Sequence, residues 1–315
     1  MSTAVLRRLI DLIPTLIGVT LVTFILMRTT GDPASLMAGP EATEEDVERI
    51  RQDMGLDRAL PVQFGMYLWD LVRGDLGESI TTNRPVVVEI GSRLGASFEL
   101  AFFSMVFAIA TGLLVGVLSA IYPRTLLDSS IRFFVFVFLA MPSFWLGLEL
   151  IMLLSRQLPL FPPAGRGQPW TPSMFGHVTL PAVTLGVSIG AFLCRILRSS
   201  MLQVMSQDYV RTARAKGLNE TKVIMKHTLK NAMIPFVTVA GLATGALLGG
   251  SVIVEQVFNW PGIGKLLIDS IHERNFPVTM GCVLVFAVVF VLVNLAVDLI
   301  YVLLDPRIRL ETTAQ

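Results

Sequence analysis

The 315-residue sequence is poor in charge and in cysteine. Charged residues make up 16% of it, whereas soluble domains carry about 25%, so an ordinary soluble protein is excluded. The two cysteines, Cys194 and Cys282, both lie in apolar runs, which leaves no disulfide framework and no metal-ligand spacing. Hydrophobic residues make up 53% of the chain, which excludes a disordered protein. The composition indicates a membrane protein.

Motifs of the common hydrolases are missing or misplaced. None of the five lysines is followed by Ser or Thr, so the phosphate-binding loop of ATPases is absent and the chain is not expected to hydrolyse ATP by that route. Residues 186–190, Gly-Val-Ser-Ile-Gly, match a hydrolase nucleophile motif. They lie inside a predicted membrane span, however, and no histidine is placed to activate Ser188. Gly186 and Gly190 are better explained as a helix-packing face.

Six stretches are long and apolar enough to cross a membrane, which takes about 20 residues. They are roughly 9–27, 96–121, 131–154, 179–202, 235–257 and 278–304. Pro142 is expected to kink the third stretch, because proline removes a backbone hydrogen bond. Arg and Lys in the short loops place both termini and residues 203–234 on the cytoplasmic side. We therefore predict an all-α polytopic membrane protein with six transmembrane helices and cytoplasmic termini.

The chain is expected to divide into a first transmembrane helix (1–28), an extracytoplasmic helical segment (29–95), a five-helix body (96–305) and a cytoplasmic tail (306–315). The extracytoplasmic segment carries twelve Asp and Glu against six Arg. Within it, Thr43 is predicted to cap a helix together with Asp46. Gly55 is expected to end that helix, and Pro61 to begin another.

Residues 208–235 form the most informative segment. It is predicted to hold two helices bent at Gly217, the second capped by Asn219. The basic side chains Lys222, Lys226 and Lys230 recur every four residues, and anionic lipid headgroups suffice to explain that stripe. The small residues before the glycine suit docking into a groove of another protein.

This segment and several others resemble the permease subunits of binding-protein-dependent ABC importers, in their dipeptide/oligopeptide branch. Ala213, Gly217 and Leu229 match the cytoplasmic EAA loop of that family. Arg211 and Thr212 replace its Glu and first Ala, and Lys230 its later proline, as in the peptide branch. Further matches are Gly-Asp-Pro at 31–33, Gly-Asp-Leu-Gly at 74–77, Val-Phe-Asn-Trp-Pro-Gly-Ile-Gly at 257–264 and Leu-Asp-Pro-Arg-Ile-Arg at 304–309.

The resemblance implies a type I ABC importer transmembrane fold, with residues 96–305 as the permease core and 203–234 as its coupling loop. The chain would form half of a pore for di- and oligopeptides in the bacterial cytoplasmic (inner) membrane, open to each side in turn. A second related permease, two ATPase subunits that bind ATP and Mg, an extracytoplasmic binding protein and membrane lipid are the implied partners. No cofactor is implied for this chain itself, and no nucleic acid.

Two alternatives remain at this point. Relatives that carry glutathione, nickel complexes or other small solutes share the same motifs. More remotely, a proton- or sodium-coupled transporter would use Asp298 and Glu149 as ion sites.

Roles are also expected for individual residues, from the resemblance for the coupling loop and from the residue pattern for the others. ATPase coupling is expected of Arg211, Thr212, Ala213, Lys216, Gly217, Leu218 and Leu229. Close helix packing is predicted for Gly112, Gly116, Gly241, Gly245 and Gly249, against this chain or a partner. Ionisable residues in spans are functional candidates, so Glu99, Glu149, Glu255 and Asp298 are expected to line the pathway or to contact the binding protein. Asp298 is expected either to pair with a base such as Arg195 or to line the pathway.

Overall fold

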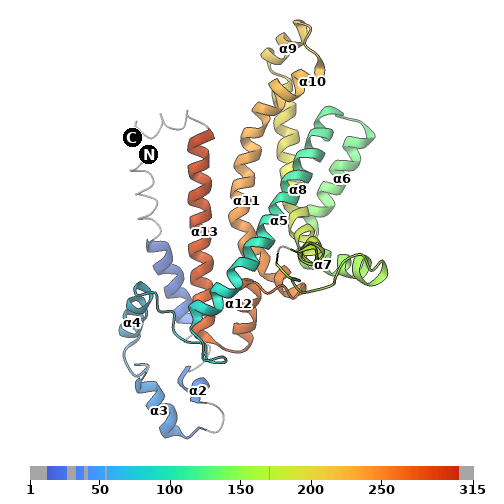
Figure 1. Cartoon of the computed structure of the whole chain (residues 1–315). Coiled ribbons are helices and arrows are strands. Elements are labelled where there is room, and N and C mark those ends of the chain that lie inside the picture. Colours follow the sequence, from blue (N-terminus) through green and yellow to red (C-terminus); the bar gives the residue numbers. More distant parts are fainter. Residues whose placement is uncertain (1–12, 27–32, 39–41, 54, 170, 305–315) are drawn as a thin grey trace, which may run out of the picture. The chain divides into compact units, whose positions relative to one another are not determined.

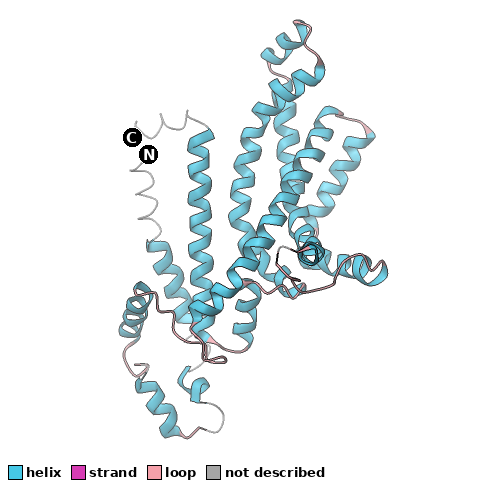
Figure 2. Cartoon of the chain, in the orientation of Figure 1, coloured by secondary structure: helices cyan, strands magenta, loops and turns pink. Residues whose placement is uncertain are grey.

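The computed structural model describes residues 13–26, 33–38, 42–53, 55–169 and 171–304 (Figure 1). Within these ranges the regular elements are helices, and strand pairing is limited to an isolated bridge between Glu78 and Pro85 (Figure 2). The all-α prediction is therefore confirmed. The chain divides into two compact units, one of residues 1–97 with 261–292 and the other of 98–260 with 293–315.

In the first unit, a capping pair, a glycine and a proline determine where helices begin and end. The Thr43 N–H and hydroxyl donate to Asp46 Oδ2 at 3.2 and 2.7 Å, and the Asp46 N–H donates to the Thr43 hydroxyl at 3.3 Å. This reciprocal cap begins α3 (Glu44–Asp53) as predicted. Gly55 follows that helix with a φ of 64°, and Pro61 lies in the first turn of α4 (Leu60–Val72). The shortest helix here is α2 (Pro33–Ala38).

The core of the first unit joins three helices. It contains the start of α5 (Val86–Ile121), α12 (Ile263–His272) and the start of α13 (Phe276–Leu304). Their buried side chains are Val86, Ile90, Ile263, Leu266, Val278 and Cys282. The loop at 78–85 is fastened to the α12–α13 turn by the buried Asn275, whose Nδ2 donates to Ser79 Oγ at 2.8 Å and to Thr81 Oγ1 at 2.9 Å.

The second unit is organised around α8 (Pro172–Met205), which packs against its neighbouring helices. These are α6 (Leu126–Ala140), α7 (Ser143–Leu150) and α11 (Lys230–Val257). The second half of α5 lies against the same helix where glycines allow close approach. A Cβ at Gly112 would lie 2.7 Å from Leu193 Cβ, and a Cβ at Gly116 would lie 3.1 Å from the Cys194 carbonyl oxygen.

The other glycines of interest differ in their surroundings. A Cβ at Gly190 would lie 2.4 Å from Thr111 Oγ1, so that position packs α8 against α5. The Ser188 hydroxyl donates to the Phe138 carbonyl at 3.4 Å. On α11, Gly241 faces Val297 of α13, where a Cβ would lie 2.6 Å from a methyl group, and Gly245 is buried. Gly249 is exposed with nothing near it.

Replacement of Gly112 by valine is expected to lower the thermal stability of the purified chain by several degrees. The new side chain would collide with Leu193, and overpacking of this kind costs about 1–3 kcal/mol. Gly249→Val is the matched control, because that side chain meets open space. Thermal unfolding of both variants in detergent measures the difference. Equal Tm values for the two would show that the α5–α8 contact contributes little.

Three described helices are long and apolar enough to cross a membrane: Val86–Ile121, Pro172–Met205 and Phe276–Val297. Two further pairs of consecutive helices are each bent at a short break. If each pair is counted as one span, the number of candidate spans is five. The shorter apolar helix Ile13–Leu26 belongs to the predicted first span, whose remaining residues lie outside the described ranges. Six spans therefore stays a prediction.

The predicted third span is not a single straight helix. Met141 and Pro142 both have extended backbone, with ψ of 126° and 134°, and α7 leaves α6 at 106°. Proline disfavours a helical conformation in the residue before it, which explains why the break includes Met141. The expected kink at Pro142 is confirmed, but it is a sharp turn. A π-helical stretch, η1 (Ile151–Gln157), continues α7.

Candidate functional site

The segment between α8 and α11 forms a small folded unit of its own. It contains α9 (Asp208–Ala215), α10 (Glu220–Lys222) and the π-helix η2 (Val223–Leu229). In Figure 1, α9 and α10 lie beyond the ends of α8 and α11. Val210, Ala213 and Val223 are buried together, with Val204 packed against them. A three-residue apolar core therefore holds α9 against η2.

The bend between the two helices has the predicted geometry. Gly217 has a φ of 75°, a conformation that glycine adopts without strain. Its N–H donates to the Arg214 carbonyl at 2.9 Å, and the Leu218 N–H donates to the Ala213 carbonyl at 3.4 Å. These bonds satisfy the last carbonyls of α9. Asn219 Oδ1 accepts from the Thr221 N–H at 3.0 Å, so the predicted cap of the second helix is confirmed.

Most of the expected coupling residues are exposed, but Ala213 is not. Ala213 is 6% exposed and lies inside the small core, because its methyl group lets α9 approach η2 closely. It is therefore not available to a partner in this structure. Leu229 is half-buried. The outward-facing members of the predicted set are Arg211, Thr212, Lys216, Gly217 and Leu218.

Side-chain contacts brace this exposed surface from both sides. The Arg214 guanidinium bonds both carboxylate oxygens of Glu220, at 2.7 and 3.1 Å, and so bridges the bend. The Arg211 side chain is 72% exposed, 3.6 Å from Asp208. At the other edge, the Tyr209 hydroxyl accepts from Asn231 Nδ2 at 2.9 Å. These contacts hold α9 to its neighbours, while the side chains of the surface remain exposed to solvent.

The second helix of this segment differs from the prediction. The three lysines Lys222, Lys226 and Lys230 are exposed, but η2 is a π-helix, with bonds from residue i to i+5. All three lysines are exposed, which agrees with the predicted basic stripe, whereas the π-helical turn between Lys222 and Lys230 was not predicted. Such π-helical turns occur frequently at functional sites.

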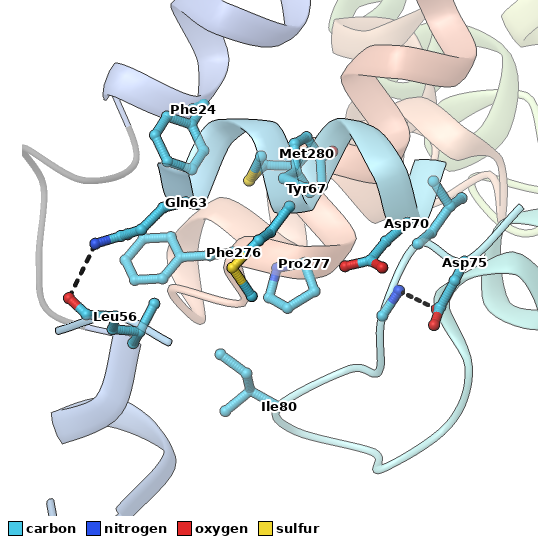
Figure 3. Close-up of a pocket in the computed structure, with 13 residues that line it drawn as sticks. Phe24, Leu56, Gln63, Tyr67, Asp70, Asp75, Ile80, Phe276, Pro277 and Met280 are labelled. Carbon is cyan, nitrogen blue, oxygen red and sulfur yellow. Dashed lines mark hydrogen bonds between the residues drawn. The ribbon is translucent and has the colours of Figure 1, made fainter. Parts of the chain in front are cut away.

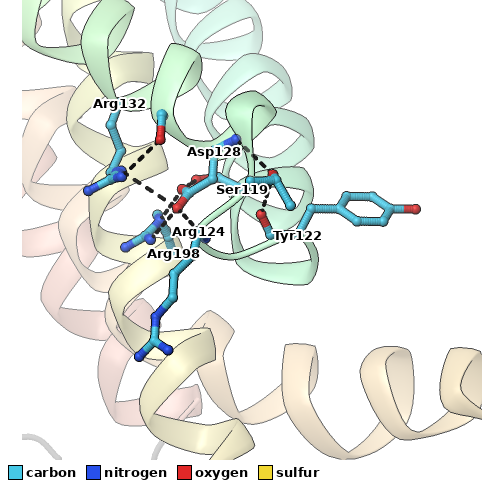
Figure 4. A network of polar contacts seen from close by, with 8 residues as sticks. Ser119, Tyr122, Arg124, Asp128, Arg132 and Arg198 are labelled. Carbon is cyan, nitrogen blue, oxygen red and sulfur yellow. Dashed lines mark hydrogen bonds and ion pairs between the residues drawn. The ribbon is translucent and has the colours of Figure 1, made fainter.

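Sequence reasoning missed the buried ionic network centred on Asp128 (Figure 4). Its carboxylate is fully buried and accepts hydrogen bonds from Nε and Nη2 of Arg198, each at 2.8 Å. Oδ1 also accepts from the Ser119 hydroxyl at 2.6 Å, and Oδ2 from the Arg124 N–H at 3.0 Å. Arg132, half-exposed, lies 3.6 Å away. The network joins α5, the turn after it, α6 and α8.

The position of Arg198 connects this network to the exposed surface. It lies on α8 seven residues before Met205, the last residue of that helix, and α9 begins at Asp208. The helix that carries Arg198 therefore leads into α9 through Ser206 and Gln207 alone. The sequence places an aspartate three residues after Thr125, which favours a helix start there, but it gives no sign of the distant partner Arg198.

The ionisable residues predicted within the spans lie in different environments. Glu99 forms a bidentate pair with Arg166, at 2.6 and 2.8 Å, and is 10% exposed. Glu149 is exposed on α7. Glu255, expected to meet ligand or binding protein, is instead fully buried on α11, where it accepts from the Ser251 hydroxyl at 3.2 Å. It is part of the helix packing in this structure.

The predicted role of Asp298 falls outside the side chains that the structure describes. Its suggested partner Arg195 stacks on the ring of Phe192, 5.1 Å from the centroid. Among the described residues no group of three or more His, Cys, Asp or Glu is placed to hold a metal ion.

Comparison with known proteins identifies the relatives of this chain. Residues 112–310 match the family model "Binding-protein-dependent transport system inner membrane component", and residues 1–101 match the model of the corresponding N-terminal region. The glutathione transport system permease protein GsiC of Escherichia coli O6:H1 is 44% identical over 306 residues, covering 97% of this chain and 98% of the relative. GsiC of Salmonella paratyphi A is 43% identical with the same coverage.

Two solved structures share the fold. The chain resembles an inward-facing conformation of the MetNI methionine ABC transporter with a TM-score of 0.57 and 21% identity, over 69% of this chain and 96% of that one. It also resembles an amino acid ABC transporter with histidines, with a TM-score of 0.54 and 16% identity, over 68% and 94% of the two chains. At these identities the likeness concerns the fold alone.

Proposed function

The chain belongs to the family of inner membrane components of binding-protein-dependent transport systems, and from that membership we propose that it forms half of a glutathione-importing pore. It is a permease subunit of a bacterial ABC importer, and ATP hydrolysis is carried out by separate ATPase subunits. The other half of the pore would be a second, related permease. Movement of the ATPases would open the pore to each side in turn.

Glutathione, the proposed substrate, is one member of the class of short peptides expected from the sequence. The resemblance to the dipeptide/oligopeptide branch suggested short peptides, and glutathione is itself a tripeptide with one γ-linked bond. The observation that supports it is the 44% identity with a glutathione permease, which extends over 97% of the chain. Identity of this extent includes the helices that would line a pore as well as the loops.

The proposal assigns a side of the membrane to each part. Residues 29–95 would face the extracytoplasmic binding protein, and 306–315 would form a cytoplasmic tail behind the core at 96–305. The loop at 203–234 would dock on an ATPase subunit. Its exposed residues Arg211, Thr212, Lys216, Gly217 and Leu218 make up what we call the coupling surface.

Uptake by the reconstituted complex tests the function. The chain would be assembled in liposomes with the second permease and the ATPase subunits of the same transport system, and supplied with its binding protein. We expect ATP-dependent uptake of labelled glutathione that unlabelled dipeptides compete for poorly. Efficient competition by dipeptides would restore the broader peptide assignment. Uptake that follows a proton or sodium gradient without ATP would instead support an ion-coupled transporter.

A further inference from the structure

A pocket of about 250 Å³ lies within the first unit (Figure 3). One side is formed by α4, which contributes Gln63, Met66, Tyr67 and Asp70, and another by the first turns of α13. Phe24 and the loop at 75–80 complete it. Pockets that enclose whole small-molecule ligands are usually about 300–1,000 Å³, so this one has room for a single long side chain.

The walls of the pocket are apolar and aromatic. Phe24 is 5% exposed, and its ring stacks on that of Tyr67 with centroids 6.3 Å apart. Phe276 and the thioethers of Met66 and Met280 add to this lining. Burial raises the pKa of Tyr67 to about 12, so its hydroxyl stays neutral at any physiological pH. Aromatic faces of this kind attract organic cations.

One polar atom of the lining is a buried hydrogen-bond acceptor without a donor in the described part of the chain. Gln63 is 8% exposed; its Nε2 donates to the carbonyls of Leu56 and Arg58, at 2.9 and 2.6 Å. Its Oε1 is buried, with no hydrogen-bond partner among the described residues. A buried acceptor left unpaired costs about 1–3 kcal/mol, so the Gln63 end of the pocket lacks a hydrogen-bond donor among the described residues.

Two carboxylates lie at the other end of the pocket. Figure 3 shows Asp70 and Asp75 together there, away from Gln63. Asp75 Oδ1 accepts from the Gly77 N–H at 2.8 Å, and neither carboxylate forms an ion pair with a described residue. The surrounding segment 29–95 has no lysine and twice as many acidic as basic residues, twelve against six. The site therefore has negative charge and acceptors, and no cation of its own.

We propose that this pocket is a socket for one arginine or lysine side chain of the extracytoplasmic binding protein. The methylene stem of such a residue would lie against the aromatic rings and thioethers, and its charged end would meet the carboxylates. Opposite charge at a docking surface also speeds the encounter of two proteins. The inference rests on the proposed function, in which residues 29–95 face the binding protein.

Binding measurements on the complete complex in lipid nanodiscs test the socket. The double variant Asp70→Asn/Asp75→Asn is expected to bind the cognate binding protein at least tenfold more weakly than the unmodified complex. Both side chains are exposed at the mouth, so the fold is retained. Glu44→Gln/Glu45→Gln is the matched control, because it removes the same charge from exposed positions at the start of α3. It should change the Kd less than twofold. Equal weakening in both variants would overturn the proposal, since general acidity would then explain the effect.

A small probe gives a second, independent measurement. Butylguanidinium has the charged end and apolar stem of arginine, and butylurea has nearly the same shape without the charge. Butylguanidinium is expected to displace the binding protein from the unmodified complex but not from the double variant, and butylurea should displace it from neither. Equal displacement by the two compounds would contradict recognition of a cation.

Failure of this inference can be told apart from failure of the proposed function. If the unmodified complex does not import glutathione, the function is wrong. If it imports normally while Asp70→Asn/Asp75→Asn leaves the Kd unchanged, the socket alone is wrong. Retention of phosphatidylethanolamine by the purified complex, lost in the double variant with an unchanged Kd, would assign the pocket to an amine lipid headgroup and also overturn the proposal.

Discussion

Asp128→Ala is expected to lower the thermal stability of the chain and to reduce transport by the complex more than tenfold. The substitution leaves the Arg198 guanidinium, bonded at two points to the buried carboxylate, without a counter-charge. Removal of one partner from a buried ion pair costs about 3–5 kcal/mol. It also frees the Ser119 hydroxyl and the Arg124 N–H, which donate to the same carboxylate. Thermal unfolding of the purified chain and ATP-driven uptake measure the two effects.

Arg132→Gln is the matched control for this network. Arg132 is half-exposed and 3.6 Å from Asp128, and exposed ion pairs contribute about 0–1 kcal/mol. Its replacement should therefore leave stability and uptake nearly unchanged. If Asp128→Ala unfolds at the same temperature as the unmodified chain, the network does not hold α8 to the α5–α6 turn.

Gly217→Val is expected to abolish coupling between the permease and its ATPase without disturbing insertion into the membrane. The backbone at this position has a φ of 75°, where a β-branched residue is strongly disfavoured. A Cβ there would meet nothing within 4 Å, so the effect comes from the backbone and not from a collision. The backbone at this bend would have to change conformation, which would displace Leu218 from the coupling surface. Recruitment of the ATPase and its stimulation by loaded binding protein are the readouts.

Gly217→Asn separates backbone geometry from side-chain bulk. Asparagine tolerates a positive φ far better than valine, so this variant should keep most of the coupling. Ala213→Asp should also fail, but for another reason, because it places a carboxylate in the core formed with Val210 and Val223. Normal coupling in Gly217→Val would show that the bend is not part of the docking surface.

Local signals in the sequence predicted local structure correctly. The Thr43–Asp46 cap, the positive φ of Gly217 and the Asn219 cap each depend on hydrogen bonds between residues a few positions apart. The break at Pro142 depends on one proline and on the restriction that it places on the residue before it. Such features are decided by the residues that carry them, so a pattern of a few letters is enough.

Features that join distant residues were not predictable in the same way. Asp128 and Arg198 are 70 positions apart, and nothing in their neighbourhoods indicates that they meet. Ala213 was expected to face a partner because small residues permit docking, but they permit packing inside the chain equally well. Glu255 was placed near a membrane surface by its position along α11, whereas its burial depends on the helices around it.

Because the turn at Pro142 ends α6 early, the length of that helix can be compared with the thickness of the bilayer. α6 has 15 residues, which extend about 22 Å at 1.5 Å per residue, short of a hydrocarbon layer of about 30 Å. Any tilt shortens its reach further. Beyond the turn, α7 presents Phe144, Trp145 and Leu148, each at least 44% exposed, along a direction 106° away from α6. The hydrophobic surface of α6 is therefore shorter than the hydrocarbon layer beside it, a mismatch that a bilayer accommodates by local thinning or that contact with another protein relieves.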